Sequence, residues 1–177
     1  GFASWLRRME VVDEAVIDRV CGLLDVDVTS ALERLSPYLT TAQIRQMADE
    51  GFTIGGHTMR HARLQLLSRE AREREIVDSC NRVRQLTGAR EVPFAFPFGG
   101  AGLDRAELGD LVARHPWIQR IFDTGGLLSD APFVIHRIAA DEPSRLSAGR
   151  SGLERVIRSN YADALSGRAA ARRETTR

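Results

Sequence analysis

The chain of 177 residues has the length of one ordinary domain and is long enough to bury a full hydrophobic core. Its composition, 43% hydrophobic and 28% charged, excludes a disordered chain, and no run approaches the ~20 apolar residues of a membrane helix. The formal net charge of +1 excludes the strongly basic balance of a nucleic-acid groove. We therefore expect neither a nucleic-acid partner nor a membrane span.

The cellular compartment stays open on this sequence. It carries no secretory signal, and it begins at Gly1 rather than at a methionine, so we expect an upstream segment to have been removed. All 25 basic residues are arginine, which suggests a GC-rich genome. Cys21 and Cys80 fit neither a zinc spacing nor a disulfide framework, and we interpret them as buried thiols.

The first part of the chain predicts helices followed by one short strand. Apolar residues recur at helical spacing over residues 1–35, which indicates one or two helices. A further helix should begin at Thr40, because its hydroxyl can cap the helix while Gln43 returns the bond, and Gly51 is expected to end it. The apolar run "FTIGG" (52–56) then predicts a strand.

Helices and strands alternate in the rest of the chain. Ser68 and Gly88 are the expected caps of one helix, and Pro116 is expected to stop another. Strands are predicted in "VPFAFPFGG" (92–100), "IQRIFDT" (118–124) and "FVIHRIAA" (133–140), and a last helix in a run with Leu153, Val156, Ile157, Tyr161 and Leu165 on one face. Such alternation favours an α/β class with a parallel sheet, in which functional residues gather after the C-terminal ends of strands.

Two of the four histidines, His57 and His61, follow the strand at 52–56. If the segment after Gly56 turns helically, both imidazoles project from the same face and can reach one ion. Neutral imidazole suits zinc and similar divalent metals, but a hydrolytic zinc centre usually has three protein ligands. On spacing alone, a strand-end cap beside an exposed histidine is commoner than a metal site.

The flanking residues change that balance. The segment "GFTIGGHTMRHARL" (51–64) resembles the second motif of the polysaccharide deacetylase family (the NodB homology domain), a His-Ser/Thr-x-x-His segment after a Gly-x-x-Ile-Gly strand. "FAFPFGG" (94–100) resembles the third motif in its Tyr-Pro-Tyr/Phe-Gly form, and "FVIHRIAAD" (133–141) resembles the closing strand. The likeness spans about residues 36–143 in family order. It implies an incomplete distorted (β/α) barrel.

The resemblance also implies a metal site. In this family two histidines and an aspartate hold a divalent metal, often zinc, which activates water to attack an acetyl carbonyl. His57 and His61 match the two histidines, and Thr58 takes the Ser/Thr position, where its hydroxyl can order the turn.

In the third motif, Pro97 would direct the chain into a turn whose Phe98 backbone N–H is the oxyanion donor. The alternative is that the three phenylalanines of the segment simply pack. The arginine that many members carry before this turn would fall at Ala95, so this chain lacks it.

The closing segment can be aligned with the family in two ways. Read as a Leu-x-His motif, Val134 replaces leucine and His136 becomes the general acid that protonates the leaving amine. Strand alternation would then place Val134, His136 and Ile138 on one inward face. Read as the Leu-Pro-Arg-Ile strand of another branch, Arg137 is the matched, supporting residue, and His136 has no assigned role.

The family's first motif, Thr-Phe-Asp-Asp-Gly, supplies the general base and the third metal ligand, and it has no counterpart here. The nearest segment, with Asp25 and Asp27, reads as a loop or helix start. We therefore expect a truncated domain rather than an eroded one. The expected organisation is a partial deacetylase-like domain over 1–143 (36–143 clearest), a C-terminal helix packed on it over 144–166, and a disordered tail over 167–177.

These observations predict a metal-dependent deacetylase, with zinc as the first choice of metal. It should hydrolyse N-acetyl groups on an acetylated saccharide, with O-acetyl groups as the second choice. As this chain alone it should be inactive, with exposed strand edges that a homodimer or a missing N-terminal segment would complete together with the metal site. Two alternatives stay open: a non-catalytic binding or assembly module, and a hydrolase of another C–N amide bond on the same scaffold. An Asp-Asp-Gly strand upstream of Gly1 favours an enzyme, and substrate profiling separates the two hydrolases.

Overall fold

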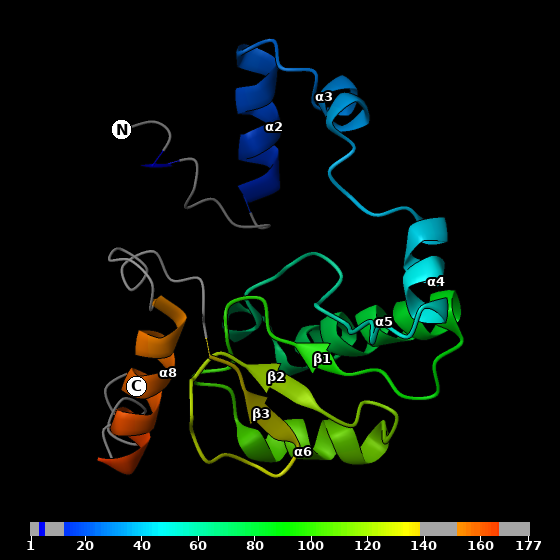
Figure 1. The fold of residues 1–177 in the computed structure, drawn as a ribbon. Helices are drawn as coiled ribbons and strands as arrows, with labels where there is room; N and C mark the ends of the chain where they lie inside the picture. The colour runs from blue at the N-terminus through cyan, green and yellow to red at the C-terminus, as the bar shows by residue number, and fades with distance from the viewer. Residues whose placement is uncertain (1–3, 6–12, 139–151, 167–177) are drawn as a thin grey trace.

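The computed structural model describes residues 4–5, 13–138 and 152–166. The predicted tail at 167–177 lies outside these residues, as do residues 139–140 of the last predicted strand. Between residue 13 and the Gly56 segment the chain forms the helices α2 (Glu14–Leu23), α3 (Val28–Leu35) and α4 (Thr41–Asp49) (Figure 1). The prediction of helices before residue 36 is confirmed for α2 and α3.

Local caps explain where these helices begin. The Asp27 side chain accepts a hydrogen bond from the Ser30 N–H (3.0 Å) at the start of α3. At the start of α4, Thr40 and Gln43 form the predicted capping box, in which the Gln43 amide oxygen accepts from the Thr40 N–H (2.8 Å). Gly51, at φ +91°, follows the end of α4 and takes the left-handed conformation that glycine adopts without strain.

A three-stranded parallel sheet forms the centre of the molecule. Its strands are β1 (Phe94–Ala95), β2 (Ile121–Asp123) and β3 (Val134–His136), in the order β1-β2-β3. Phe94 pairs with Ile121, which pairs with Val134. The combination of helices with a parallel sheet confirms the α/β class. The described residues show these three strands and no closed barrel.

The predicted strand at 52–56 is wrong in extent, because only Gly56 pairs, in a parallel bridge to Phe94. The segment carries two glycines, which favour strands poorly. They are needed for close packing: a Cβ on Gly56 would lie 2.4 Å from the Cys80 Sγ, and one on Gly55 2.9 Å from the Pro93 carbonyl oxygen. Burial raises the pKa of the Cys80 thiol to about 11, as a buried thiol requires, whereas Cys21 is only half-buried.

The remaining helices flank the sheet. A 3₁₀ turn, η2 (Leu64–Leu66), leads into α5 (Arg69–Thr87), which begins at the Ser68 cap and ends at Gly88 (φ +70°), as predicted. Helix α6 (Arg105–Arg114) begins at an Asp104 cap and ends before Pro116. Helix α8 (Gly152–Leu165) lies beside the sheet, and its Asn160 approaches Gly126, where an added Cβ would lie 2.4 Å from the Asn160 Oδ1.

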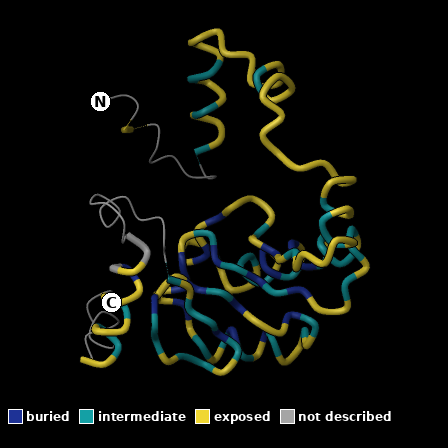
Figure 2. The backbone as a smooth tube through the Cα atoms, in the orientation of Figure 1, coloured by how far each residue is buried: buried dark blue, intermediate teal, exposed yellow. Residues whose placement is uncertain are grey.

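The hydrophobic core lies between the sheet, α5 and α6, where buried residues gather in Figure 2. Its fully buried members include Ile76, Cys80, Val92, Phe94, Phe96, Leu108, Ile118 and Ile121. By contrast, α2, α3 and α4 contain no buried residue. Of the helices in the described part of the chain, none combines the length and apolarity needed to cross a membrane.

Candidate active site

The two histidines meet at the C-terminal end of the Gly56 bridge. Their ring centroids lie 5.0 Å apart with an interplanar angle of 67°. The expected helical turn is wrong, because residues 57–63 are not helical. The rings instead converge through a tight loop in which Thr58 (φ +61°) and His61 (φ +55°) both take the left-handed conformation. Such backbone is unfavourable for residues other than glycine, so the surrounding contacts must hold the loop.

A hydrogen bond fixes the tautomer of His57. Its Nδ1 lies 2.8 Å from the Ala95 carbonyl oxygen of β1, and because a carbonyl only accepts, Nδ1 must carry the proton. The Nε2 of a neutral His57 ring therefore keeps its lone pair. Both histidine residues are exposed. The parallel register that places Ala95 next to the end of the Gly56 bridge thus leaves the Nε2 of this ring unused by that hydrogen bond.

Glu75 of α5 holds the histidine loop through hydrogen bonds. Its buried carboxylate accepts from the backbone N–H groups of Met59 (2.8 Å) and Arg60 (3.2 Å) and from the Arg60 Nε (2.8 Å). Burial alone would raise the pKa of Glu75, but these hydrogen bonds outweigh it and lower the pKa. The sequence could not single this residue out, because "REAREREIVD" contains further glutamates of equal appearance.

Thr58 also contributes to the loop. Its hydroxyl accepts a hydrogen bond from the Ala62 N–H at 3.2 Å, across the turn that carries His61. The side chain thus bonds backbone within the loop.

The turn after β1 lies against His61. The Phe98 ring centroid is 4.9 Å from that of His61, and the Arg63 guanidinium carbon is 4.7 Å from the same phenyl centroid. Phe94 and Phe96 are buried, whereas Phe98 is 47% exposed, so only the first two pack as core residues. Within the described part of the chain, no acceptor is found for the Phe98 N–H. On the other side of the turn, the Gln65 amide donates to the carbonyls of Gly99 and Ala101, both at 3.0 Å.

The structure does not bring His136 to the histidine pair. It ends β3, three strand spacings of about 4.8 Å from the Gly56 segment. Its side chain is 4% exposed, the Nε2 donates to the Asp130 carboxylate (2.7 Å), and the Nδ1 accepts from the Gly125 N–H (3.0 Å). Arg137 is exposed, and its backbone N–H donates to the Asp123 carbonyl (2.7 Å).

A group of three side chains with metal-binding atoms does exist near β3. Atoms of Asp123, Asp130 and His136 lie within 4.8 Å of one another, and they form the only such group among the described residues. The Arg105 guanidinium already lies between the carboxylates, with its Nη2 3.1 Å from Asp123 and 3.0 Å from Asp130. The part of the chain described here therefore places no carboxylate with His57 and His61 in a group of this kind.

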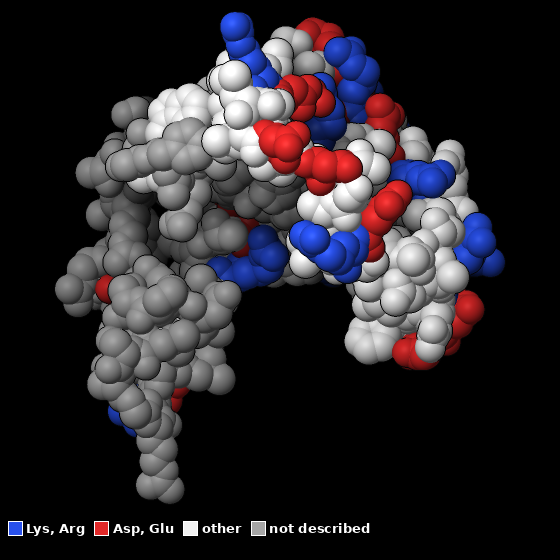
Figure 3. All heavy atoms as spheres, turned by 90° about the horizontal axis from the view of Figure 1, so that it is seen from above, with Lys and Arg blue, Asp and Glu red and all other residues white. Residues whose placement is uncertain are grey.

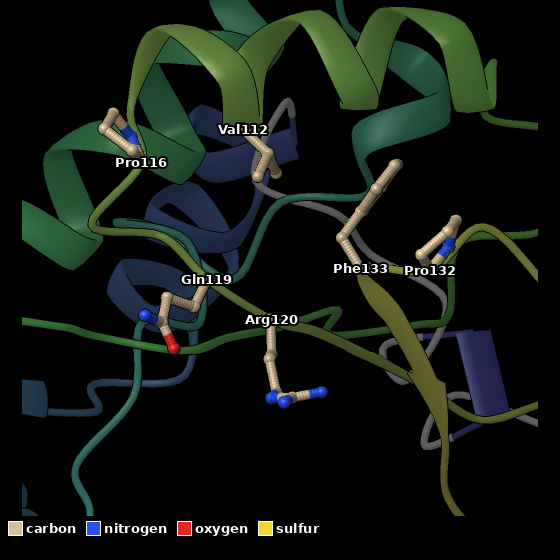
Figure 4. A pocket seen from close by; sticks show the side chains of 6 residues that line it. All are labelled: Val112, Pro116, Gln119, Arg120, Pro132 and Phe133. Atoms are coloured by element: carbon tan, nitrogen blue, oxygen red, sulfur yellow. The ribbon is translucent and has the colours of Figure 1, made fainter.

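A pocket of about 390 Å³ lies at the opposite ends of the strands. It is lined by Val112, Pro116, Gln119, Arg120, Pro132 and Phe133 (Figure 4). Gln119 and Arg120 precede β2, and Pro132 and Phe133 precede β3, so the pocket opens at the N-terminal strand ends. It is therefore separate from the histidine pair.

Over the described part of the face drawn in Figure 3, basic and acidic side chains are interspersed.

Comparison with known proteins supports the reading of the histidine segment. The family model described as polysaccharide deacetylase matches residues 24–109. The match includes both histidines and the Phe98 turn, and ends before β2 and β3, so His136 and Arg137 lie beyond it. Neither the curated proteins nor the solved structures give a match. This match supports a polysaccharide deacetylase family domain over residues 24–109, as the resemblance to the second and third motifs predicted.

Proposed function

We propose that His57 and His61 bind one divalent metal ion, with zinc as the preferred metal, in a carbohydrate deacetylase. The preferred reaction is the removal of N-acetyl groups from a saccharide, with O-acetyl groups as the second choice. One observation carries the proposal: on a segment that matches the deacetylase family, the two imidazole centroids lie 5.0 Å apart at a strand end. Zinc–nitrogen bonds of about 2.0–2.1 Å at a tetrahedral angle hold two bound imidazole centroids roughly 5 Å apart.

The donor chemistry fits the same ion. The Nδ1–H of His57 is engaged by the Ala95 carbonyl, which leaves the Nε2 as the ligand atom and fixes the ring's orientation. Both residues are exposed, so a saccharide can reach an ion bound there. Thr58 and Glu75 would keep the loop in its left-handed conformation and so hold the two ligands at this separation.

A bound metal would lower the pKa of water toward ~7 and polarise the acetyl carbonyl. The chain's own contribution is to position the substrate and to stabilise charge. Pro97 directs the backbone into the turn, and the backbone N–H of Phe98, whose ring lies 4.9 Å from that of His61, would be the donor for the oxyanion that forms on the carbonyl oxygen. Phe98 also offers an exposed ring surface on which a sugar can pack.

We further propose that the third ligand and the general base come from a carboxylate-bearing strand in a preceding segment or a second copy of the chain. The 52–56 segment pairs through Gly56 with Phe94, and no other strand of the described residues pairs with it, so a further strand could be added at this edge. Added strands there would extend the three-stranded sheet toward the distorted (β/α) barrel. This chain alone would then be inactive.

Acetate release from N-acetylated and O-acetylated oligosaccharides, measured with the full-length protein and Zn²⁺, tests the proposal. We expect release that is lost in His57→Ala and kept in His115→Ala, a histidine that lies near Glu73 at 3.5 Å. Metal binding without any acetate release would instead favour the binding or assembly module. Release from small cyclic or linear amides, with none from saccharides, would favour the other amide hydrolase.

A further inference from the structure

A buried ion cluster lies at the ends of β2 and β3, in a part of the chain that the proposed function leaves unassigned. Arg105, at the start of α6, donates from its Nη2 to Asp123 (3.1 Å) and Asp130 (3.0 Å), and from its Nε to the other oxygen of Asp130 (3.1 Å). The side chains of Asp123 and Asp130 are only 6% and 2% exposed. His136 donates to Asp130 at 2.7 Å and closes the cluster on the β3 side.

The cluster holds both polar backbone groups of one residue in the turn after β1. The Gly100 N–H donates to the Asp123 Oδ1 at 2.8 Å, and the Gly100 carbonyl accepts from the Arg105 Nη1 at 2.8 Å. A Cβ on Gly100 would lie 2.8 Å from the Asp123 Oδ2 and 2.4 Å from the Phe96 ring, so only glycine allows this approach. The preceding Gly99, at φ +91°, also needs glycine's conformational freedom.

The same turn connects the cluster to the histidine loop. Gln65, four residues after His61, bonds the carbonyls on both sides of Gly100. Phe98, two residues before Gly100, has its ring 4.9 Å from the His61 ring. The turn is thus held from the β2–β3 side by charged groups and from the other side by the segment that carries the histidines.

A contribution to stability alone does not explain such a cluster. Buried ion pairs carry a desolvation cost, and well-packed apolar residues of similar volume often stabilise a fold as much or more. What apolar residues cannot supply is a fixed acceptor and a fixed donor for the two backbone groups of Gly100. Bonds to ionised partners are shorter and stronger than neutral ones, and Arg105 binds through a rigid fork.

We propose that Arg105 and Asp123 are positioning residues, which fix the Gly99–Gly100 turn and thereby position Phe98, whose ring lies beside His61. Asp130 accepts hydrogen bonds from the Arg105 guanidinium, and His136 in turn donates to Asp130, so these two residues orient Arg105. The catalytic consequence rests on the proposed function, because it needs the Phe98 N–H to act as the oxyanion donor. The structural consequence, a fixed Gly99–Gly100 turn, does not depend on the proposed function.

Amide hydrogen exchange of the chain, followed residue by residue, tests the structural consequence. In the unsubstituted protein, the Gly100 N–H should exchange about as slowly as the Ile121 N–H, which donates to the Phe133 carbonyl between β2 and β3. Rapid exchange at Gly100, like that of an exposed loop, would overturn the proposal before any variant is made.

In Arg105→Gln, the exchange rate of Gly100 relative to Ile121 should rise at least ~10-fold. The matched control is Arg114→Gln, which removes an arginine at the other end of α6 that also binds one carboxylate, Glu73, through two nitrogens. This control should leave the ratio unchanged, although its overall stability can fall. An unchanged ratio in Arg105→Gln, or an equal rise of the ratio in both variants, would reject the positioning role of Arg105.

Kinetics of the full-length protein then separate the two proposals. Loss of oxyanion-donor placement should lower kcat of Arg105→Gln by ~10²-fold with little change in KM. A raised exchange ratio with unchanged kcat would support the positioning role and reject Phe98 as the donor. An unchanged exchange ratio rejects the positioning role whatever the activity.

Discussion

The two halves of this molecule carry equally clear helix signals and differ in what they bury. Helix α3 has Val28, Leu32 and Leu35 on one face, yet these residues are 46%, 41% and 68% exposed. Helix α5 has a comparable apolar stripe, and its Ile76 and Cys80 are fully buried. Caps and periodicity thus determine where helices form, whereas burial needs a facing surface, which only the sheet provides among the described residues.

The largest effect should come from the core of the sheet. Phe94 is fully buried and its ring lies 5.5 Å from that of Phe96. Phe94→Ala should lower the free energy of unfolding by about 3–5 kcal/mol, because it removes buried apolar surface and leaves a cavity. Denaturant titration followed by circular dichroism measures this loss. A loss below ~1 kcal/mol would mean that the sheet is not the stabilising centre of the chain.

The next effect concerns the buried acid of the ion cluster. Burial alone would raise the pKa of Asp130, but hydrogen bonds from Arg105, the Ala131 N–H and His136 lower it to about 2. Since this lies below the unfolded value near ~3.9, ionised Asp130 stabilises the fold above about pH 4, and this stabilisation is lost as the pH falls toward ~2. The expected loss is about 2 kcal/mol. Asp130→Asn should remove this part of the pH dependence of the unfolding free energy, and identical pH profiles would contradict the assignment.

A smaller effect is expected at the capping box that begins α4. Thr40→Ala removes the acceptor for the Gln43 N–H and should destabilise that helix by about 1 kcal/mol. Faster amide exchange within α4, with unchanged exchange in α5, would show that the effect is local. Equal acceleration in both helices would mean that α4 and the core unfold together.

The smallest effect should come from α3. Leu32→Ser should change the free energy of unfolding by no more than ~0.5 kcal/mol, because Leu32 is 41% exposed and α3 contains no buried residue. A loss above ~1 kcal/mol would show that the apolar face of α3 packs against another surface in solution, and the contrast between the two halves would then disappear.

Much of the fold followed from local signals. The caps at Thr40, Ser68 and Gly88 and the order of helices and strands were all predictable, because each depends on a few adjacent residues. The strand at 52–56 was overpredicted, since its apolar letters do not reveal that Gly55 and Gly56 are required for close packing on Pro93 and Cys80.

For the site, the sequence motif singled out His57 and His61, but the helical explanation of their proximity was wrong. The residues that hold the site could not be found from sequence. Glu75 and Arg105 are single charges in arginine- and glutamate-rich helices, and their partners lie up to 25 residues away. Only the tertiary arrangement distinguishes them from solvent-exposed neighbours.

The most direct test of the central claim is the zinc content of the full-length protein after equilibration with Zn²⁺ and removal of unbound metal. The account predicts about one equivalent in the unsubstituted protein and in His115→Ala, and almost none when His57 and His61 are both replaced by alanine. Zinc retained at full stoichiometry in that double variant would contradict the account.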